Sequence, residues 1–402
     1  MTPTNVLSRW RTESVGPVPD LLAALPDPLG YAWIRGRTGF VAWGTAAAIE
    51  GVRGPDRWAR SAGELADLFD SVDRVDGALP LALGSFAFDP GGRSEIVVPS
   101  AVLRSDSGGA RLDFCGEQRP LMSESPLSPA VPRIRYAGST ISELAWLEAV
   151  DTAIKRIGRG ELDKVVLARD VLVWARDPFD RRSLAARLAA RFPECFTFAF
   201  STMVGATPEL LVRRSGTSVE SLVLAGSARR GSDPTEDDEI GAALLSSDKD
   251  LREHRLSVES VTDVLEGVCG ALDAEGPFLM KLANVQHIAT RVGGRASGEH
   301  SALEIAGLLH PTAAVCGAPR AAAMDAISTL EGMDRGRYSG PVGWVDANGD
   351  GEFGIALRCA EVDGTRARLF AGSGIVADSR PEAELEETRL KLRAMQDALS
   401  GR

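Results

Sequence analysis

The stretch ELDKVVLARD, residues 161–170, has the composition of a β-strand and holds one residue that does not suit it. Its centre is the apolar run VVL, and side chains alternate across a strand. One face then carries Leu162, Lys164, Val166 and Ala168. An unpaired ammonium group is costly to bury. Lys164 therefore either extends to solvent or is required there by a site.

The composition excludes several classes of protein. The chain has 402 residues, 44% of them hydrophobic, which is enough for a large core or two sub-domains. Its net charge of −11 and the absence of a long Lys/Arg run argue against nucleic acid and membrane partners. No segment approaches the roughly 20 apolar residues of a membrane span. No signal peptide is evident, and the five scattered cysteines favour neither disulfides nor zinc. We expect a cytoplasmic protein with reduced thiols.

The order of predicted elements divides the chain in two. Residues 1–117 mix short strand-like runs with one helix-like stretch, and residues 118–133, with four prolines, read as a linker. A helix over 142–160 precedes the Lys164 strand, and several strands and helices follow without regular βαβ alternation. This order favours a mixed, largely antiparallel sheet over a Rossmann-type fold. We assign 1–133 to an N-terminal part and 134–402 to the catalytic region.

Two later stretches predict helices that carry acids. SSDKDLREHRLSVESVTDVLEGV, from residue 246, would be capped by Ser247 or Asp248. Lys249, Glu253 and Ser257 share one face of it at a spacing of four residues. A Lys–Glu pair on a solvated face would explain that spacing without any function. Taken alone, this stretch favours the solvated pair.

The second stretch, ADSRPEAELEETRLKLRAMQDAL, spans residues 377–399. Ser379 and Glu382 predict a capping box around the intervening proline. Glu384, Glu387 and Lys391 fall within roughly 60° of one another around the helix, beside its apolar stripe. Acids are favoured at any helix start. Carboxylates at such a boundary would also suit a hard cation such as Mg²⁺.

Three further features are ambiguous when taken singly. Glu209 follows a Gly-Ala-Thr-Pro turn at the mouth of an apolar strand. DANGDGE, residues 346–352, imitates an EF-hand loop, but the twelfth position is Leu357, so we predict a β-hairpin turn. Residues 224–231 and 371–376 read as glycine-containing loops whose backbone N–H groups could hold a carboxylate.

Together and in this order, the stretches resemble the chorismate-utilising enzymes. That family comprises isochorismate synthases, salicylate synthases, anthranilate synthase component I and aminodeoxychorismate synthase component I. The resemblance covers about residues 140–395. It is carried by LDKVVLARD, GATPELL, LAGSARRG, DKDLREH, KLANVQHIATRVGG, LLHPTAAVCGAPR, RGRYSGPVGW, GEFGIALRCAEV and AGSGIVADSRPEAELEET.

The resemblance implies a fold, a substrate and a set of site residues. The fold is α/β of the α+β type, in two halves, with large, mainly antiparallel sheets packed face to face inside helices. The reaction is Mg²⁺-dependent and acts on chorismate. By position, Lys164 resembles the general base and Glu209 the general acid. Glu253 and Glu387 resemble the metal carboxylates, with Glu384 an acid behind them. The matching substrate contacts are Gly226, Ser227, Tyr338, Arg358, Gly372 and Lys391.

This implied chemistry gives Lys164 a reason to be buried. Water adds at C2 of chorismate as the C4 hydroxyl leaves, and an ammonium pushed toward neutrality by burial can take the proton of that water. Glu209 can protonate the leaving hydroxyl if its pKa is raised. The metal holds the ring carboxylate and stabilises developing charge.

Two positions distinguish the branches of the family from one another. Water-using members carry Lys at position 164, and Ala225 stands where aminodeoxychorismate synthases carry a nucleophilic Lys. HPTAAVCGAPR resembles the isochorismate synthase branch more than the salicylate synthases, which also eliminate pyruvate. A non-catalytic chorismate-binding module is a remote alternative. The resemblance further implies a monomer without a glutaminase subunit, whose product feeds menaquinone or siderophore biosynthesis.

Overall fold

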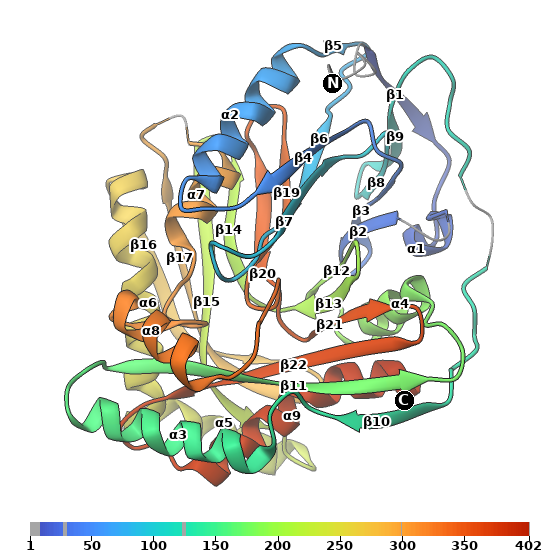
Figure 1. The fold of residues 1–402 in the computed structure, drawn as a ribbon. Helices are drawn as coiled ribbons and strands as arrows, with labels where there is room; N and C mark the ends of the chain where they lie inside the picture. Colours follow the sequence, from blue (N-terminus) through green and yellow to red (C-terminus); the bar gives the residue numbers. More distant parts are fainter. Residues whose placement is uncertain (1–8, 27–29, 123–125, 299, 402) are drawn as a thin grey trace.

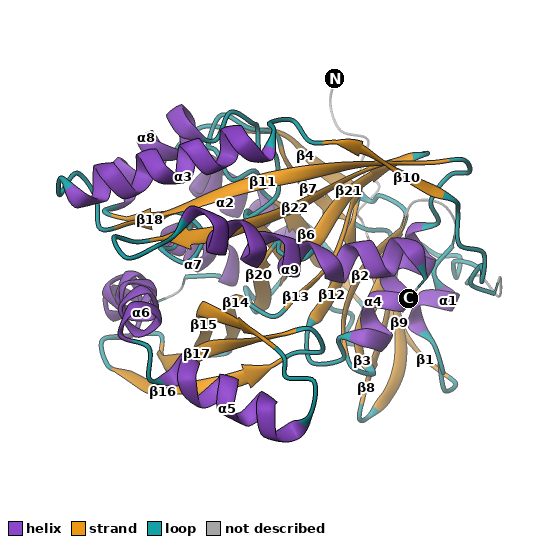
Figure 2. Ribbon diagram, turned by 90° about the horizontal axis from the view of Figure 1, so that it is seen from below, coloured by secondary structure: helices purple, strands orange, loops and turns teal. Residues whose placement is uncertain are grey.

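The computed structural model describes residues 9–26, 30–122, 126–298 and 300–401. Two large sheets face each other, and the helices cover their outer sides (Figures 1 and 2). Among the described strands, every pair is antiparallel except β1 with β5. The predicted α/β class with mainly antiparallel sheets is therefore confirmed.

Over the described residues, the first sheet has 13 strands. Their spatial order is β10 (Ile134–Gly138), β11 (Lys164–Ala175), β22 (Arg366–Ile375), β21 (Cys359–Asp363), β13 (Met203–Thr207), β12 (Phe196–Phe200), β2 (Gly30–Arg35), β3 (Thr38–Trp43), β8 (Ala101–Asp106), β9 (Gly109–Cys115), β1 (Arg9–Val15) and β5 (Asp73–Arg74). The short β18 (Gly317–Ala318) pairs with the start of β11. Strands from both predicted parts of the chain thus share this sheet.

The second sheet has nine strands within the described part of the chain and also draws on both parts of the sequence. Their order is β16 (Leu272–Lys281), β17 (Val285–Arg295), β15 (Ser218–Arg229), β14 (Leu210–Ser215), β20 (Gly351–Ile355), β19 (Pro341–Asp346), β6 (Leu81–Ser85), β7 (Ser94–Val98) and β4 (Ala47–Val52). The hairpin of β19 and β20 contains the DANGDGE segment, which confirms the predicted turn.

Three apolar cores hold these layers together. One lies between the sheets and includes Phe198 from the first and Leu210 from the second. The other two lie under the helices, one beneath α2, α3, α6, α7 and α8 and the other beneath α1, α4 and α9. The helices are α1 (Leu21–Ala24), α2 (Arg57–Asp70), α3 (Glu143–Gly158), α4 (Arg181–Arg191), α5 (Pro234–Leu245), α6 (Asp248–Cys269), α7 (Ala302–Leu309), α8 (Arg320–Leu330) and α9 (Pro381–Ser400).

Strand β11, the source of the opening stretch, is buried on both faces rather than one. Its residues from Lys164 to Asp170 are all buried. Its flanking strand β22 runs beside it across the lower part of Figure 1. Helix α3 packs on it, and the Trp146 indole donates a hydrogen bond to the Ala168 carbonyl at 3.2 Å. A charged residue at the start of β11 therefore has no simple route to solvent.

Two local predictions are wrong. The segments 224–231 and 371–376 are mostly the ends of β15 and β22, because distant strands supply ladder partners for their backbone groups. The predicted capping box of α9 does not form. Arg380 is its N-cap residue, and the Ser379 hydroxyl instead accepts from the backbone N–H of Val376 at 3.2 Å. The predicted Ser247 cap of α6 is confirmed.

Two general expectations concern the class of the protein. Within the described part of the chain, no helix has the length and apolar character that a membrane crossing needs. All five cysteine side chains are thiols, as expected.

Candidate active site

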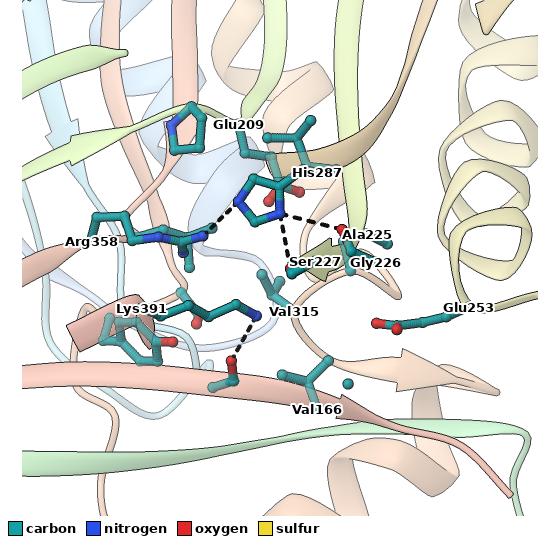
Figure 3. Close-up of a pocket in the computed structure, with 18 residues that line it drawn as sticks. Val166, Glu209, Ala225, Gly226, Ser227, Glu253, His287, Val315, Arg358 and Lys391 are labelled. Atoms are coloured by element: carbon teal, nitrogen blue, oxygen red, sulfur yellow. Dashed lines mark hydrogen bonds between the residues drawn. The ribbon is translucent and has the colours of Figure 1, made fainter. Parts of the chain in front are cut away.

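A pocket between the two sheets gathers most of the predicted site residues. Its empty volume is about 540 Å³, including the part open to solvent. Figure 3 shows side chains from both sheets and from α6 and α9 pointing into it. The predicted residues that line it are Glu209, Gly226, Ser227, Glu253, Tyr338, Arg358, Gly372 and Lys391. Residues nearly 200 positions apart in the chain therefore meet in one place.

Lys164 is fully buried, with 0% of its surface exposed. Its ammonium donates to the Ser257 hydroxyl at 2.9 Å and lies 3.1 Å from Oε1 of Glu253. Glu253 itself lines the pocket. The lysine thus does not extend to solvent; it is tied to a carboxylate that lines the pocket.

The solvated Lys249–Glu253 pair considered from the sequence does not form. Lys249 instead donates to Oε1 of Glu384 at 2.7 Å, because α9 packs close to the start of α6. The second oxygen of Glu384 accepts from the Ser373 hydroxyl of β22 at 2.6 Å. Glu384 is buried and joins α6, β22 and α9.

Glu387 and Lys391 form the second ion pair of the site. The Lys391 ammonium lies 2.5 Å from Oε1 of Glu387 and 3.0 Å from the Gly372 carbonyl oxygen, to both of which it donates. Burial alone would raise the pKa of Glu387, but the ammonium groups of Lys391 and Lys249 outweigh it and lower that pKa. Glu387 therefore remains a carboxylate.

Glu209 has the opposite character. It lies between β13 and β14 and is 5% exposed. Burial raises its pKa to about 7, although the positive charges of Lys164, Arg358 and Lys391 partly oppose the shift. A carboxyl group with this pKa is substantially protonated near neutral pH. Glu209 is thus suited to donate a proton while Glu387 stays ionised.

Tyr338 and Arg358 also line the pocket. The Tyr338 ring stacks on Phe370 with centroids 5.0 Å apart, and burial raises the pKa of its hydroxyl to about 12. Tyr338 therefore stays neutral. Arg358 has a backbone φ of 48°, in the left-handed region that non-glycine residues rarely occupy. Such backbone strain is concentrated at functional sites.

His287 is a pocket residue that we did not single out from the sequence. It lies on β17, and its ring contacts Arg358 at 2.9 Å and Ser227 at 2.9 Å (Figure 3). Burial, reinforced by the charges of Arg358 and Lys391, lowers its pKa well below the ordinary value. The sequence showed it only as one letter of KLANVQHIATRVGG, since its contacts depend on the pairing of β15 with β17.

The carboxylates of the site offer ligands for a hard cation. Among the described residues, no group of three His, Cys, Asp or Glu side chains forms a ready-made metal cage. Glu253 nevertheless supplies oxygen donors in the pocket wall, and Glu387 supplies them beside the pocket. The negative charges of both glutamates act on the ammonium group of Lys249. Mg²⁺ is commonly held by one or two carboxylates, with water and substrate as the other ligands. The donor set therefore fits Mg²⁺.

The chain is similar in sequence to known proteins. A model of the chorismate binding enzyme family matches residues 117–400. Isochorismate synthase DhbC of Bacillus subtilis is 35% identical over 372 residues, which cover 89% of this chain and 90% of that protein. Isochorismate synthase EntC of Escherichia coli is 34% identical over 338 residues, which cover 83% of this chain and 84% of that protein.

Solved structures show the same fold. MenF, the menaquinone-specific isochorismate synthase of Escherichia coli, matches with a TM-score of 0.79 and 27% identity over 97% of this chain and 94% of its own. Anthranilate synthase component I of Streptococcus pneumoniae matches with a TM-score of 0.69 over 98% of this chain and 93% of its own. Its identity of 20% supports a shared fold alone.

Proposed function

The chain belongs to the family of chorismate-binding enzymes, and from this premise we propose that it converts chorismate to isochorismate. The observation that carries the proposal is a fully buried lysine, held by the pocket carboxylate Glu253, together with Glu209, an acid of raised pKa that lines the same pocket. Relatives named as isochorismate synthases, which match most of the chain, support the same reaction.

The two groups divide the proton transfers between them. In the proposed reaction Lys164 acts in its neutral amine form and accepts a proton from the water that adds at C2. Glu209, protonated near neutral pH, gives its proton to the C4 hydroxyl, which leaves as water. Lys164 comes from β11 of the first sheet, and Glu209 directly precedes β14 of the second. The substrate ring would therefore lie between the sheets.

The cations and small residues of the pocket suit a dianionic substrate. Arg358 and Lys391 place positive charge in the pocket, and Gly226, Ser227 and Gly372 keep the backbone accessible beside it. Tyr338, neutral at its raised pKa, adds a hydroxyl close to Gly372. We propose these six residues as the substrate contacts.

Glu253 and Glu387 are the proposed Mg²⁺ ligands. When bound, the ion would hold a substrate carboxylate and offset its negative charge. Both glutamates are paired with lysines that the proposal uses elsewhere, Lys164 and Lys391. Glu384 would hold Lys249 and Ser373 in place behind them.

The proposal extends to the surroundings of the enzyme. Because water is the nucleophile, the chain needs no glutaminase subunit, and we propose that it acts as a cytoplasmic monomer. The relatives include isochorismate synthases named for menaquinone and for the siderophore vibriobactin, so the proposal is confined to the reaction.

A product assay tests the proposal. The purified chain is incubated with chorismate and Mg²⁺ near neutral pH, and the products are separated by chromatography while pyruvate is measured enzymatically. We expect isochorismate without stoichiometric pyruvate, and no turnover after the metal is chelated. Salicylate with pyruvate would make the chain a salicylate synthase, and binding of chorismate without any product would make it a binding module.

A further inference from the structure

Arg358 is a buried cation held by a neutral partner. It is 9% exposed, and its Nε has no hydrogen-bond partner in the part of the chain that the structure describes. Among the described residues, no carboxylate lies within ion-pair distance of its guanidinium, and its one side-chain hydrogen bond runs from Nη2 to Nε2 of His287 at 2.9 Å. Buried arginines are ordinarily paired with an acid. The missing counter-ion therefore requires an explanation.

The contact fixes which ring nitrogen of His287 carries the proton. A guanidinium only donates hydrogen bonds, so Nε2 of His287 must accept. Burial and the nearby charges of Arg358 and Lys391 keep the ring neutral by lowering its pKa. The single ring proton is therefore on Nδ1, which lies 2.9 Å from the Ser227 hydroxyl oxygen and 3.3 Å from the Gly226 carbonyl oxygen.

A bulge in β15 provides the acceptors for that proton. Ala225 pairs with Ile288 and Ser227 with His287, so Gly226 is an extra residue with a φ of 80°. A Cβ added at Gly226 would lie 3.1–3.3 Å from side-chain atoms of Ile288 and Asp250. Any residue with a side chain would also be strained there, because the backbone is in the left-handed region. The bulge thus directs the Gly226 carbonyl and the Ser227 side chain toward one face of His287.

We propose that His287 is the positioning residue for Arg358: its neutral, Nδ1-protonated ring orients the guanidinium in the pocket without neutralising it. An aspartate or glutamate could orient Arg358 equally well but would cancel its charge. A neutral acceptor leaves that charge available for a carboxylate of the substrate. This last step rests on the proposed function, because it takes chorismate as the ligand.

The alternative is that His287 only fills the core. Both His287 and the distant His310 are buried, and His310 contacts the Phe88 carbonyl at 3.2 Å. A core-filling residue would affect stability but would have no particular coupling to Arg358. The two explanations therefore differ in spectroscopy and in kinetics.

The first experiment needs no substrate. Histidine ¹⁵N NMR of the whole chain, with the His287 signals assigned by their loss in His287→Gln, reports which nitrogen is protonated. We expect a neutral ring protonated at Nδ1 throughout the neutral pH range. A ring protonated at Nε2, or an imidazolium near neutral pH, would overturn the proposal even if chorismate were not the substrate.

The second experiment uses two substitutions that keep different halves of the imidazole. In His287→Gln the amide oxygen reaches the position of Nε2 and can still accept from Arg358. In His287→Asn the amide ends near Nδ1 and retains only the bulge contact. We expect His287→Asn to raise KM for chorismate roughly 10- to 100-fold, the scale of a lost hydrogen bond to a charged group, with a smaller change in kcat. His287→Gln should largely retain KM.

Coupling to Arg358 is then measured by a double-mutant cycle. In an Arg358→Ala background, which has no guanidinium to orient, His287→Asn should have little further effect on KM. Additive effects of the two substitutions would overturn the proposal, as would equal KM values for His287→Gln and His287→Asn. His310→Asn is the matched control: it should lower thermal stability as a buried substitution and leave KM unchanged.

Discussion

At the scale of single residues, Lys164 shows how a charged side chain occupies a fully buried strand position. Its ammonium is satisfied by Ser257 and Glu253, which are one helical turn apart on α6. Strand alternation placed Lys164 among apolar neighbours, so its burial was predictable. Its partners were not, because nothing in residues 161–170 indicates that α6 lies across the pocket.

Removing Lys164 tests its proposed role as base. Lys164→Ala should lose roughly 10²–10⁴-fold in turnover rate, the usual contribution of a positioned general base. Chorismate binding should fall far less, since Arg358 and Lys391 remain. Steady-state kinetics with a thermal unfolding control measure both effects. Lys155→Ala, which removes an exposed lysine of α3, should behave as the unchanged protein. A Lys164→Ala enzyme with near-normal turnover would contradict the assignment.

The raised pKa of Glu209 predicts the direction in which enzyme activity changes with pH. The protonated form donates to the leaving hydroxyl, and the pKa of Glu209 is raised from 4.5 to about 7. Activity that needs this proton is therefore complete only well below the raised pKa of about 7 and falls as the pH rises through it. The profile of kcat/KM, which reports the free enzyme, should show this alkaline fall. Glu209→Gln should be nearly inactive and should lack it; a wild-type profile that stays flat across neutral pH would disprove the acid role.

At the scale of elements, Gly374 of β22 keeps room for the ion pair of Lys164. A Cβ at this position would lie 2.0 Å from Oε1 of Glu253 and 3.1 Å from Cε of Lys164. The absence of a side chain at Gly374 therefore leaves space beside β22 for the Glu253 side chain of α6. The glutamate end can move aside at little cost in folding, but not without disturbing its contact with Lys164.

Gly374→Ala should therefore separate activity from stability. We expect the free energy of unfolding to change by no more than about 1 kcal/mol, the scale of most tolerated substitutions. Turnover should fall at least roughly tenfold, because small displacements of reacting groups are costly. Gly63→Ala in α2, where no atom of the described residues lies within 4 Å of the added Cβ, is the control that should leave turnover intact. If Gly374→Ala destabilised the fold without reducing the activity of the folded enzyme, this interpretation of β22 would fail.

Element prediction from the sequence succeeded where local signals sufficed. The start of α6 and the β19–β20 hairpin follow from a serine cap and a turn motif. It failed where distant pairing decides the outcome: residues 371–375 end β22 because β11 supplies their ladder partners. The predicted cap of α9 was wrong for a similar reason. The Ser379 hydroxyl accepts a hydrogen bond from the backbone N–H of Val376, directly after β22, rather than from a backbone N–H of the helix.

At the scale of the whole molecule, the pocket depends on both sheets and on helices from separate regions of the chain. Its lining residues lie between positions 166 and 391, and the sheet order brings strands of the N-terminal part into both layers. Periodicity alone indicated only a mixed antiparallel architecture. The two-layer arrangement was predictable through the family resemblance, because pairings such as β12 with β2 join residues more than 160 positions apart.

A ligand that bridges the sheets should stabilise the whole fold. The incomplete metal cage predicts that Mg²⁺ alone raises Tm little, whereas Mg²⁺ with chorismate raises it by several degrees, because binding to the native state alone stabilises it. Thermal unfolding of the Lys164→Ala variant, which should leave chorismate unconsumed, measures this. Adding Glu387→Gln should abolish the synergy. An equal shift with Mg²⁺ alone would indicate a complete site formed by protein ligands.

The central claim, that this chain adds water to chorismate at C2 and expels the C4 hydroxyl, is tested most directly by isotope incorporation. The reaction is run with chorismate and Mg²⁺ in water enriched in heavy oxygen, and the product is examined by chromatography and mass spectrometry. The account predicts isochorismate that contains one solvent oxygen and no accompanying pyruvate. Isochorismate without solvent oxygen, or salicylate and pyruvate as the main products, would contradict it.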